Sequence, residues 1–281
     1  YDAVMGGYWP SANAIATMRH GRVGGTLIEK ITMSTTGNAT VFGDATVTSV
    51  YIANGSMGSF TRGIMAGGSP PGSPLDVIDY ITFSTDGNAA DFGNLTQARG
   101  QPGSGSNSVR GIVAGGATPS RVNTIDYITM ASLGNATDFG DTTVARNEIA
   151  PMFNPTRGCL AGGRTPTVLN TIDFVEISTT GNATDFGDLS VATSTAGGTA
   201  SSVRGVVAGG FSPSATSVAQ FITMASQGNG TDFGDLTVAR QGVSGMGNSV
   251  KGIFAGGEDP ALSNVIDQLV ITTGGTGTDF G

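Results

Sequence analysis

One unit of sequence recurs along the whole chain, and it constrains the fold more than any other feature. In its third copy the unit contains RGIVAGG (Arg110 to Gly116), then IDYITM, then GNATDFGD. Each copy contains a Phe-Gly pair, whose glycine stands at positions 43, 93, 140, 187, 234 and 281. The spacing is 50 residues once and 47 residues four times, a period typical of propellers and solenoids. Because six copies fill the 281 residues, we expect a single domain, 1–281.

Within each copy, turn residues separate four short segments, each of the length of one strand. In the third copy these are a Gly/Ser-rich run before Val109, RGIVAGG, NTIDYITMAS and NATDFGDTTVAR. Glycine accounts for 46 residues and aromatic residues for only 7%, so the fold relies on close backbone approach, and helix is disfavoured. We therefore expect an all-β, six-bladed propeller with four-stranded antiparallel blades, because blades stacked in a ring cover each other's faces. The glycine strands are expected near the axis and the Phe-Gly strands toward the rim.

The order of segments resembles the kelch repeat: a hydrophobic run that ends in Gly-Gly, a strand with an aromatic residue, and an aromatic-centred strand that closes on Arg. Phe139 stands where kelch repeats usually carry Trp, and Arg146 where they often carry Arg. The sequence segments IDYIT and GNATDFGD also resemble repeats of virion structural proteins of marine bacteriophages, cyanophages especially. This resemblance implies a kelch-like propeller and a virion component, and it is specific for fold rather than for activity.

The first copy differs in length. From the Gly-Gly pair to the Phe-Gly pair it holds 12 residues more than the third copy. The extra residues fall within YWPSANAIATMRHGRVGG, which we place between the second and third strands. Tyr1 aligns with Arg110 at the start of a second strand, and the chain stops at Gly281, which leaves no segment for the first strand of the first blade. We therefore expect a piece of a longer polypeptide, or a ring closed by something outside these residues.

The net charge limits the classes of partner that the chain can bind, and the cysteine content bears on its chemistry. The chain carries 21 Asp+Glu against 13 Lys+Arg, a formal net charge of −8. A negative surface repels phosphate backbones and anionic headgroups, so we expect no nucleic-acid partner, and no run is long enough for membrane insertion through a helix. Cys159 stands where other copies have Ile or Val, so it is predicted to be a small buried hydrophobic residue rather than a reactive thiol.

Two columns of aspartate flank the Phe-Gly pairs. They are Asp91, Asp138, Asp185, Asp232 and Asp279 before Phe, and Asp44, Asp141, Asp188 and Asp235 after Gly. Such carboxylates could hold Ca²⁺, but the alternating D-x-D spacing is missing, so we expect no metal site and no cofactor. The alternative is that each Asp accepts backbone N–H bonds or meets a repeated Arg from the facing strand: Arg62, Arg110, Arg157 or Arg204.

Single copies lose polar positions that the others keep. Copy one has Glu29-Lys30 for the Asp-aromatic pair, copy four has Thr193 in place of Arg146, and copy five has Gln220 for the aspartate of IDY. No polar column is therefore an invariant catalytic ring. The Asn-Ala-Thr triplets match the glycosylation acceptor pattern, but they fall on one hairpin turn, whose turn chemistry explains them.

The residues that the chain contains favour some classes of function over others. His20 is the only histidine, which excludes a histidine-rich copper site and leaves poor material for a catalytic site, so we expect no catalytic residues and no enzyme. We favour a non-enzymatic structural or binding module of a phage virion, such as a tail fibre, adhesin or decoration protein, which mediates host attachment or particle assembly. Its partners would be other virion proteins or a host surface receptor, glycan or protein, with a homo-oligomer possible. A cellular kelch-like protein-interaction scaffold is the alternative, and a propeller enzyme the third class.

The insertion of the first copy is the predicted ligand-binding region. Copy-specific insertions in repeat proteins map to loops on one face and are often used for recognition. This one holds or adjoins Tyr8, Trp9, Arg19, His20 and Arg22, with the only Trp and the only His of the chain. Trp and Tyr bury large areas with few rotatable bonds and stack on sugars or protein surfaces. Alternatively, Trp9 covers the exposed edge of an incomplete first blade.

Overall fold

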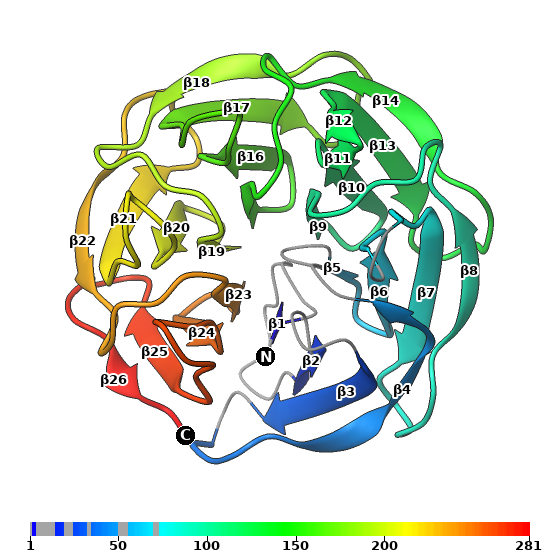
Figure 1. The fold of residues 1–281 in the computed structure, drawn as a ribbon, viewed down its shortest axis with the longest axis horizontal. Helices are drawn as coiled ribbons and strands as arrows, with labels where there is room; N and C mark the ends of the chain where they lie inside the picture. The colour runs from blue at the N-terminus through cyan, green and yellow to red at the C-terminus, as the bar shows by residue number, and fades with distance from the viewer. Residues whose placement is uncertain (1, 4–14, 20–24, 33–34, 50–55, 70–72) are drawn as a thin grey trace.

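The fold is all-β. The computed structural model describes residues 2–3, 15–19, 25–32, 35–49, 56–69 and 73–281. Every regular element in these residues is a strand, and the strands form four-stranded antiparallel sheets arranged around a common axis as the blades of a β-propeller (Figure 1). In the same residues, no helix is long and apolar enough to cross a membrane.

Five sheets share one form, with their four strands in sequence order from the axis outward. The first two consist of β5 (Ser56–Gly58), β6 (Arg62–Ala66), β7 (Val77–Thr82) and β8 (Ala90–Asn94), then β9 (Gly103–Ser106), β10 (Arg110–Ala114), β13 (Thr124–Thr129) and β14 (Thr137–Asp141). The third and fourth consist of β15 (Ala150–Phe153), β16 (Arg157–Ala161), β17 (Thr171–Glu176) and β18 (Thr184–Asp188), then β19 (Gly197–Ala200), β20 (Arg204–Ala208), β21 (Val218–Thr223) and β22 (Thr231–Asp235). The fifth consists of β23 (Ser244–Gly247), β24 (Lys251–Ala255), β25 (Ile266–Val270) and β26 (Thr278–Asp279). A short ribbon, β11 (Ala117–Thr118) with β12 (Ser120–Arg121), projects between β10 and β13.

The four predicted segments of the third copy are the four strands of its sheet, and the Phe-Gly strands lie outermost, as predicted (Figure 1). The RGIVAGG strand, expected near the axis, is the second strand from it. The innermost strand is the Gly/Ser-rich run, because inner strands of neighbouring blades crowd together around the axis. A Cβ atom added at Gly105 would meet the Phe153 ring, and one added at Gly245 would meet the backbone of Gly198.

A further four-stranded sheet contains β1 (Asp2–Ala3), β2 (Ile15–Arg19), β3 (Gly25–Thr32) and β4 (Thr40–Ser49). All four strands come from this chain, so the prediction of a missing first strand is wrong. The prediction that the extra residues of copy one separate the second and third strands is wrong for the same reason. IATMR is itself the second strand, paired with β3 from Ile28 to Thr32. The Gly-Gly pair at positions 6–7 was misleading as a marker of that strand.

Hydrophobic clusters lie between neighbouring sheets rather than inside one sheet. One cluster joins Ile112 and Phe139 to Leu160 and Val175 of the next sheet. The β1–β4 sheet packs in this way on both sides. Its Ile28 and Phe42 share a cluster with Met65 and Ile81, and its Ile31 shares another with Ile253 and Phe280.

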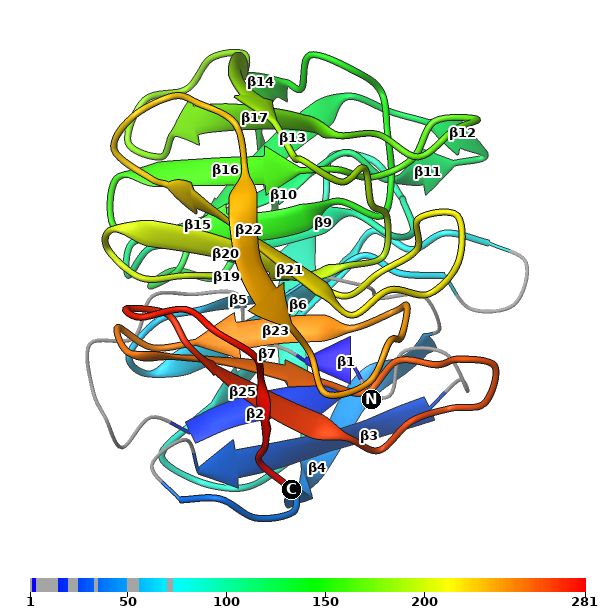
Figure 2. The same ribbon diagram turned by 90° about the vertical axis from the view of Figure 1, so that its left-hand side faces the viewer.

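The propeller has two different ends, visible edge-on in Figure 2. The connections between second and third strands, including the β11–β12 ribbon, lie at one end, which we call the loop end. The hairpin turns between first and second strands and between third and fourth strands lie at the other, the turn end. In the described residues, the loop end therefore consists of loops between second and third strands and of linkers, the segments that lead from one blade to the next.

Candidate functional site at the loop end

The outer seam between neighbouring blades explains two repeated motifs. At one seam the Gly181 N–H donates to the Phe139 carbonyl (2.8 Å), and the Asp141 N–H donates to Asn182 Oδ1 (3.0 Å). A Cβ atom at Gly140 would run into the Gly181 backbone, so the Phe-Gly glycine is required by close approach. The Asn of the Asn-Ala-Thr triplet thus bonds to the preceding blade, a role that goes beyond the predicted turn chemistry.

Buried ion pairs join neighbouring blades deeper in the structure. Arg146 Nη2 lies 3.1 Å from Asp173 Oδ2, and both side chains are fully buried. The guanidinium also donates to the Leu160 carbonyl (2.9 Å), and Thr143 donates to Asp173 through its N–H (3.1 Å) and its hydroxyl (2.6 Å). Burial lowers the pKa of Arg146, and the charge of Asp173 opposes that shift. Equivalent pairs are Arg99 with Asp126 and Arg240 with Asp267.

The predicted partnership between the flanking aspartates and the strand arginines is wrong. Arg110 instead lies over the Tyr127 ring, with Cζ 4.4 Å from its centroid, and donates to the Ile177 carbonyl of the next blade (2.8 Å). The aspartates before Phe are exposed, and Asp235 accepts a hydrogen bond from the Ser217 hydroxyl (2.9 Å). The planar guanidinium thus contacts the ring face and a carbonyl on the adjacent blade instead of an exposed carboxylate.

The arginine missing from copy four and the aspartate missing from copy five belong to the same seam. The arginine of each copy pairs with the aspartate of the next copy, so Thr193 and Gln220 occupy the two halves of one pair position. Gln220 Oε1 accepts from the Ser190 hydroxyl (2.7 Å) and from the Val191 N–H (2.9 Å), as the aspartates accept from Thr at the other seams. We call this contact, between the β15–β18 and β19–β22 sheets, the Thr193 seam. A charged pair has been replaced there by a neutral one.

The remaining sequence predictions on single residues have different outcomes. Cys159 is fully buried, as predicted, and burial raises the pKa of its thiol to about 12. Arg19 is the last residue of β2, and its backbone lies opposite Asp2 of β1 and Ile28 of β3 in the sheet. Tyr8, Trp9, His20 and Arg22 lie outside the described residues, so the predicted ligand-binding loop stays a prediction. Within the described ranges, no three or more His, Cys, Asp or Glu side chains gather as a metal site.

Residues that differ between copies meet at the loop end. The linker residue that follows the buried arginine, or Thr193 in copy four, bridges to the residue that follows Gly-Gly in the next copy. The bridged pairs are Gly100 with Ala117, Asn147 with Arg164, Ser194 with Phe211, and Gln241 with Glu258. The Gly-Gly backbone keeps similar positive φ values, so the chain path is nearly constant while the side chains change. Sequence analysis missed this set, although the copies show it as variable positions beside unchanging glycines.

The linkers also form a chain of hydrogen bonds around the axis. The Glu148 N–H donates to the Gln101 carbonyl (3.0 Å), the Thr195 N–H to the Glu148 carbonyl (3.2 Å), and the Gly242 N–H to the Thr195 carbonyl (3.0 Å). All four residues have φ between 52° and 68°. Three of them are not glycine, so the backbone there is held in a conformation that L-residues rarely adopt.

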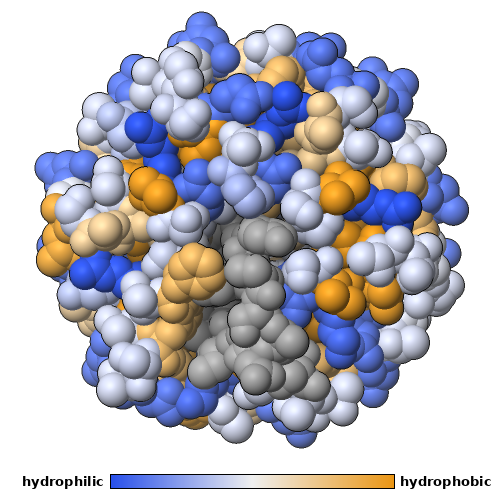
Figure 3. Space-filling view, turned by 180° about the vertical axis from the view of Figure 1, so that it is seen from behind, coloured by the Kyte–Doolittle hydropathy of each residue, from blue (hydrophilic) through white to orange (hydrophobic). Residues whose placement is uncertain are grey.

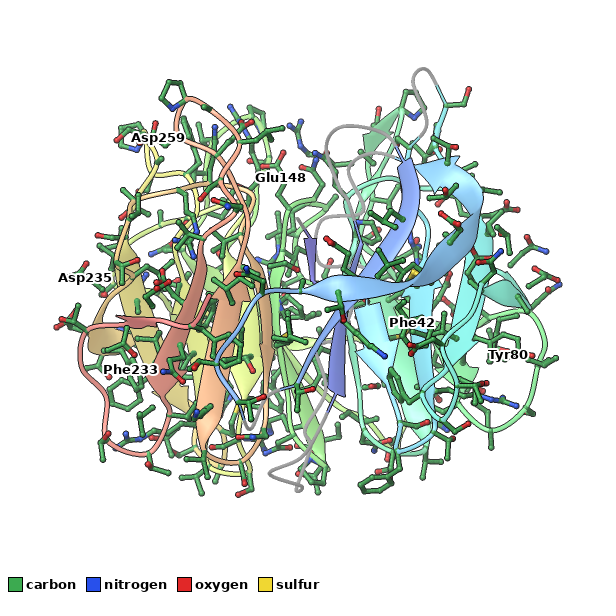
Figure 4. The ribbon with its side chains drawn as sticks, turned by 90° about the horizontal axis from the view of Figure 1, so that it is seen from below. Phe42, Tyr80, Glu148, Phe233, Asp235 and Asp259 are labelled. Atoms are coloured by element: carbon green, nitrogen blue, oxygen red, sulfur yellow. The ribbon has the colours of Figure 1, made fainter. Side chains whose placement is uncertain are left out.

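Polar side chains gather at this position. Asn147 Nδ2 donates to Gln101 Oε1 (2.7 Å), and Arg121 Nε donates to Asn147 Oδ1 (3.0 Å). Glu148 is 9% exposed, and its Oε2 is buried without a hydrogen-bond partner. Figure 4 shows Glu148 near the middle of the propeller, at the same end as Asp259. The loop end therefore has a polar, copy-specific centre.

The turn end has a different surface. Exposed apolar side chains occupy the turns between first and second strands: Phe60, Val109, Val203 and Val250. Figure 3 shows this end, where apolar side chains are spread among polar ones. Valine occupies the position before the Arg or Lys of the second strand in three described blades, and Thr61 and Thr156 occupy it in two others.

No protein-family model matches this chain, and a search of curated proteins gave no match either. The candidate site is therefore defined by the fold and by differences among the copies.

Proposed function

We propose that this chain is a six-bladed, kelch-like propeller that acts as a non-enzymatic binding module of a bacteriophage particle. The role would be that of a tail fibre, adhesin or decoration protein. Its localisation would be the virion, and its partners a host surface receptor or other virion proteins.

The count of six blades is supported by contacts on both sides of the β1–β4 sheet. The Gly37 N–H donates to the Phe280 carbonyl (2.9 Å), which repeats the outer seam seen between Gly181 and Phe139. A Cβ atom at Gly281 would run into the Gly37 backbone, as at the other Phe-Gly glycines. With the shared hydrophobic clusters, these contacts favour a ring that closes through β1–β4.

One observation carries the binding function. Most of the side chains that build the seams repeat from copy to copy, whereas those around the axis at the loop end differ in charge, size and polarity. In repeat folds the shared positions build the stack and the variable positions on one face serve recognition. Arg164, Phe211 and Glu258 occupy the same structural position, and this variety suits an asymmetric ligand.

The placement on a phage particle is supported by the resemblance of the repeats to those of marine phage virion proteins. A direct test is mass spectrometry of purified phage particles beside lysate of uninfected cells. Detection in particles only supports the virion component, and detection in uninfected cells would favour the cellular interaction scaffold. The fluorescent recombinant chain should also label susceptible marine cyanobacterial cells and leave resistant cells unlabelled. Absence from particles combined with no cell labelling would contradict the proposal.

A further inference from the structure

The loop end departs from the repeat pattern beside the Thr193 seam. Three side-chain oxygen atoms there are buried without a hydrogen-bond partner: Glu148 Oε2, Ser194 Oγ and Thr195 Oγ1. The Thr195 N–H bonds to the Glu148 carbonyl, so the three residues are adjacent. Unsatisfied buried polar atoms destabilise a protein, and each requires an explanation.

The backbone at two of these residues is also strained. Glu148 and Thr195 have φ of 60° and 52°, whereas the equivalent Gly242 has φ of 68°. Glycine would relieve the strain, and copy five shows that this position accepts it. Glu148 and Thr195 thus each combine an unpaired buried oxygen with a backbone conformation that disfavours a side chain. This combination is typical of functional sites.

The surrounding residues complete a mixed set of donors and acceptors. The backbone of Asn147 is bonded to that of Arg164, and the backbone of Ser194 to that of Phe211. Arg164 Cζ lies 5.7 Å from the centroid of the Phe211 ring, and both side chains are half-buried. A guanidinium over an aromatic ring thus occupies the two positions whose backbones are bridged to Asn147 and Ser194.

This chemistry suits one class of ligand. Sugar hydroxyls can donate to the unpaired carboxylate oxygen and exchange hydrogen bonds with the Ser and Thr hydroxyls, while amide and guanidinium groups donate to sugar oxygens. A divalent cation such as Ca²⁺ needs six to eight oxygen ligands, and the described residues offer one carboxylate here. An anionic glycan would face Glu148 and a chain of net charge −8.

We infer that the loop end binds a neutral saccharide at Glu148, Ser194 and Thr195. This inference rests on the proposed binding function and names the class of receptor that the propeller takes. Glu148 accepts hydrogen bonds from sugar hydroxyls, and the two hydroxyl side chains complete the contact.

The test uses an array of neutral oligosaccharides probed with the whole chain, with EDTA or with Ca²⁺ in the buffer. Variants are Glu148→Gln, Ser194→Ala and Thr195→Val, and the matched control is Asp138→Asn, which removes the charge of an exposed carboxylate at the rim. We expect the wild type and the control to bind the same glycans in both buffers. Glu148→Gln should bind at least about tenfold more weakly, because a buried polar contact of the complex is impaired. Ser194→Ala and Thr195→Val should also weaken binding with no loss of thermal stability, whereas a purely structural role would lower the melting temperature.

Three results would overturn the inference. They are no wild-type signal on any neutral glycan, a signal unchanged by Glu148→Gln, and a signal that requires Ca²⁺, which would indicate a cation site. Cell labelling with the same variants separates this failure from failure of the proposed function. If the Glu148→Gln variant labels cells as the wild type does, the propeller is an adhesin that binds through another surface.

Discussion

The Thr193 seam allows a direct test of how the blades are joined. We predict that Thr193→Arg and Gln220→Asp each destabilise the protein, whereas the double variant restores most of the lost stability. The reason is that the two positions are the halves of one pair. At the equivalent seam, Arg146 meets Asp173 and the Leu160 carbonyl.

The single variants should differ in severity. Thr193→Arg places a guanidinium against Gln220, whose Oε1 already accepts two hydrogen bonds, so a buried charge lacks its partner. An uncompensated buried charge of this kind costs about 3–5 kcal/mol. Gln220→Asp keeps both donors and resembles Asp79, which is 2% exposed and accepts from the Thr46 N–H (3.0 Å) and hydroxyl (2.6 Å). We expect about 1–3 kcal/mol for this change.

In the double variant the introduced guanidinium faces a carboxylate and the Val207 carbonyl, which is equivalent to that of Leu160. We expect stability within about 1.5 kcal/mol of wild type and a coupling free energy of at least about 2 kcal/mol. Urea unfolding measures it without screening the ion pair, as guanidinium chloride would. If the two single effects simply add in the double variant, the proposed pairing of Thr193 with Gln220 is refuted.

Three other predictions concern single positions. At pH 8 the buried thiol of Cys159, with a pKa of about 12, should not react with a disulfide reagent until urea unfolds the chain, and rapid reaction of the folded protein would contradict its burial. Gly140→Ala should lower stability by about 1–3 kcal/mol because its Cβ atom meets the next blade. Gly87→Ala, where nothing lies within 4 Å, should have a small effect on the urea midpoint, and equal losses would argue against the seam contact. Arg110→Lys should cost less than about 1 kcal/mol, seen as a small drop in melting temperature, because an ammonium keeps the charge over the Tyr127 ring; a larger loss would mean that the carbonyl contact dominates.

Strand positions could be predicted from the sequence because the copies repeat every turn signal. The Gly/Ser-rich run before Val109 and the RGIVAGG run are separate strands, and the TDFGD strand is at the rim, as the pattern indicates. Burial of Cys159 followed from its alignment with Ile and Val. Each of these predictions depends on residues within one copy, or on the comparison of equivalent positions.

Contacts between copies could not be predicted in this way. Arg146 is 20 residues from Asp126 in its own copy and 27 from Asp173 in the next, and a list of repeated residues does not choose between them. The structure chooses Asp173, because neighbouring blades are stacked face to face. The loop-end residues were missed for a related reason. Asn147 and Ser194 are unremarkable in sequence, and only the bridges to Arg164 and Phe211 bring them together.

The energetics of a repeat ring explain why a seam can lose its ion pair without loss of the fold. Each blade contacts only its two neighbours, so the free energy of the propeller is close to a sum of blade and seam contributions. A loss at the Thr193 seam therefore stays local, and the Arg–Asp pairs at Arg99, Arg146 and Arg240 are unaffected. The unpaired oxygens of Glu148, Ser194 and Thr195 lie beside this one neutral seam. The seam at Asp79 also lacks an arginine, because Ser49 stands at the position of Arg146, but there a carboxylate is kept. The Thr193 seam is the one described seam at which both halves of the pair are neutral, and changes at the loop end beside it should leave the three Arg–Asp seams intact.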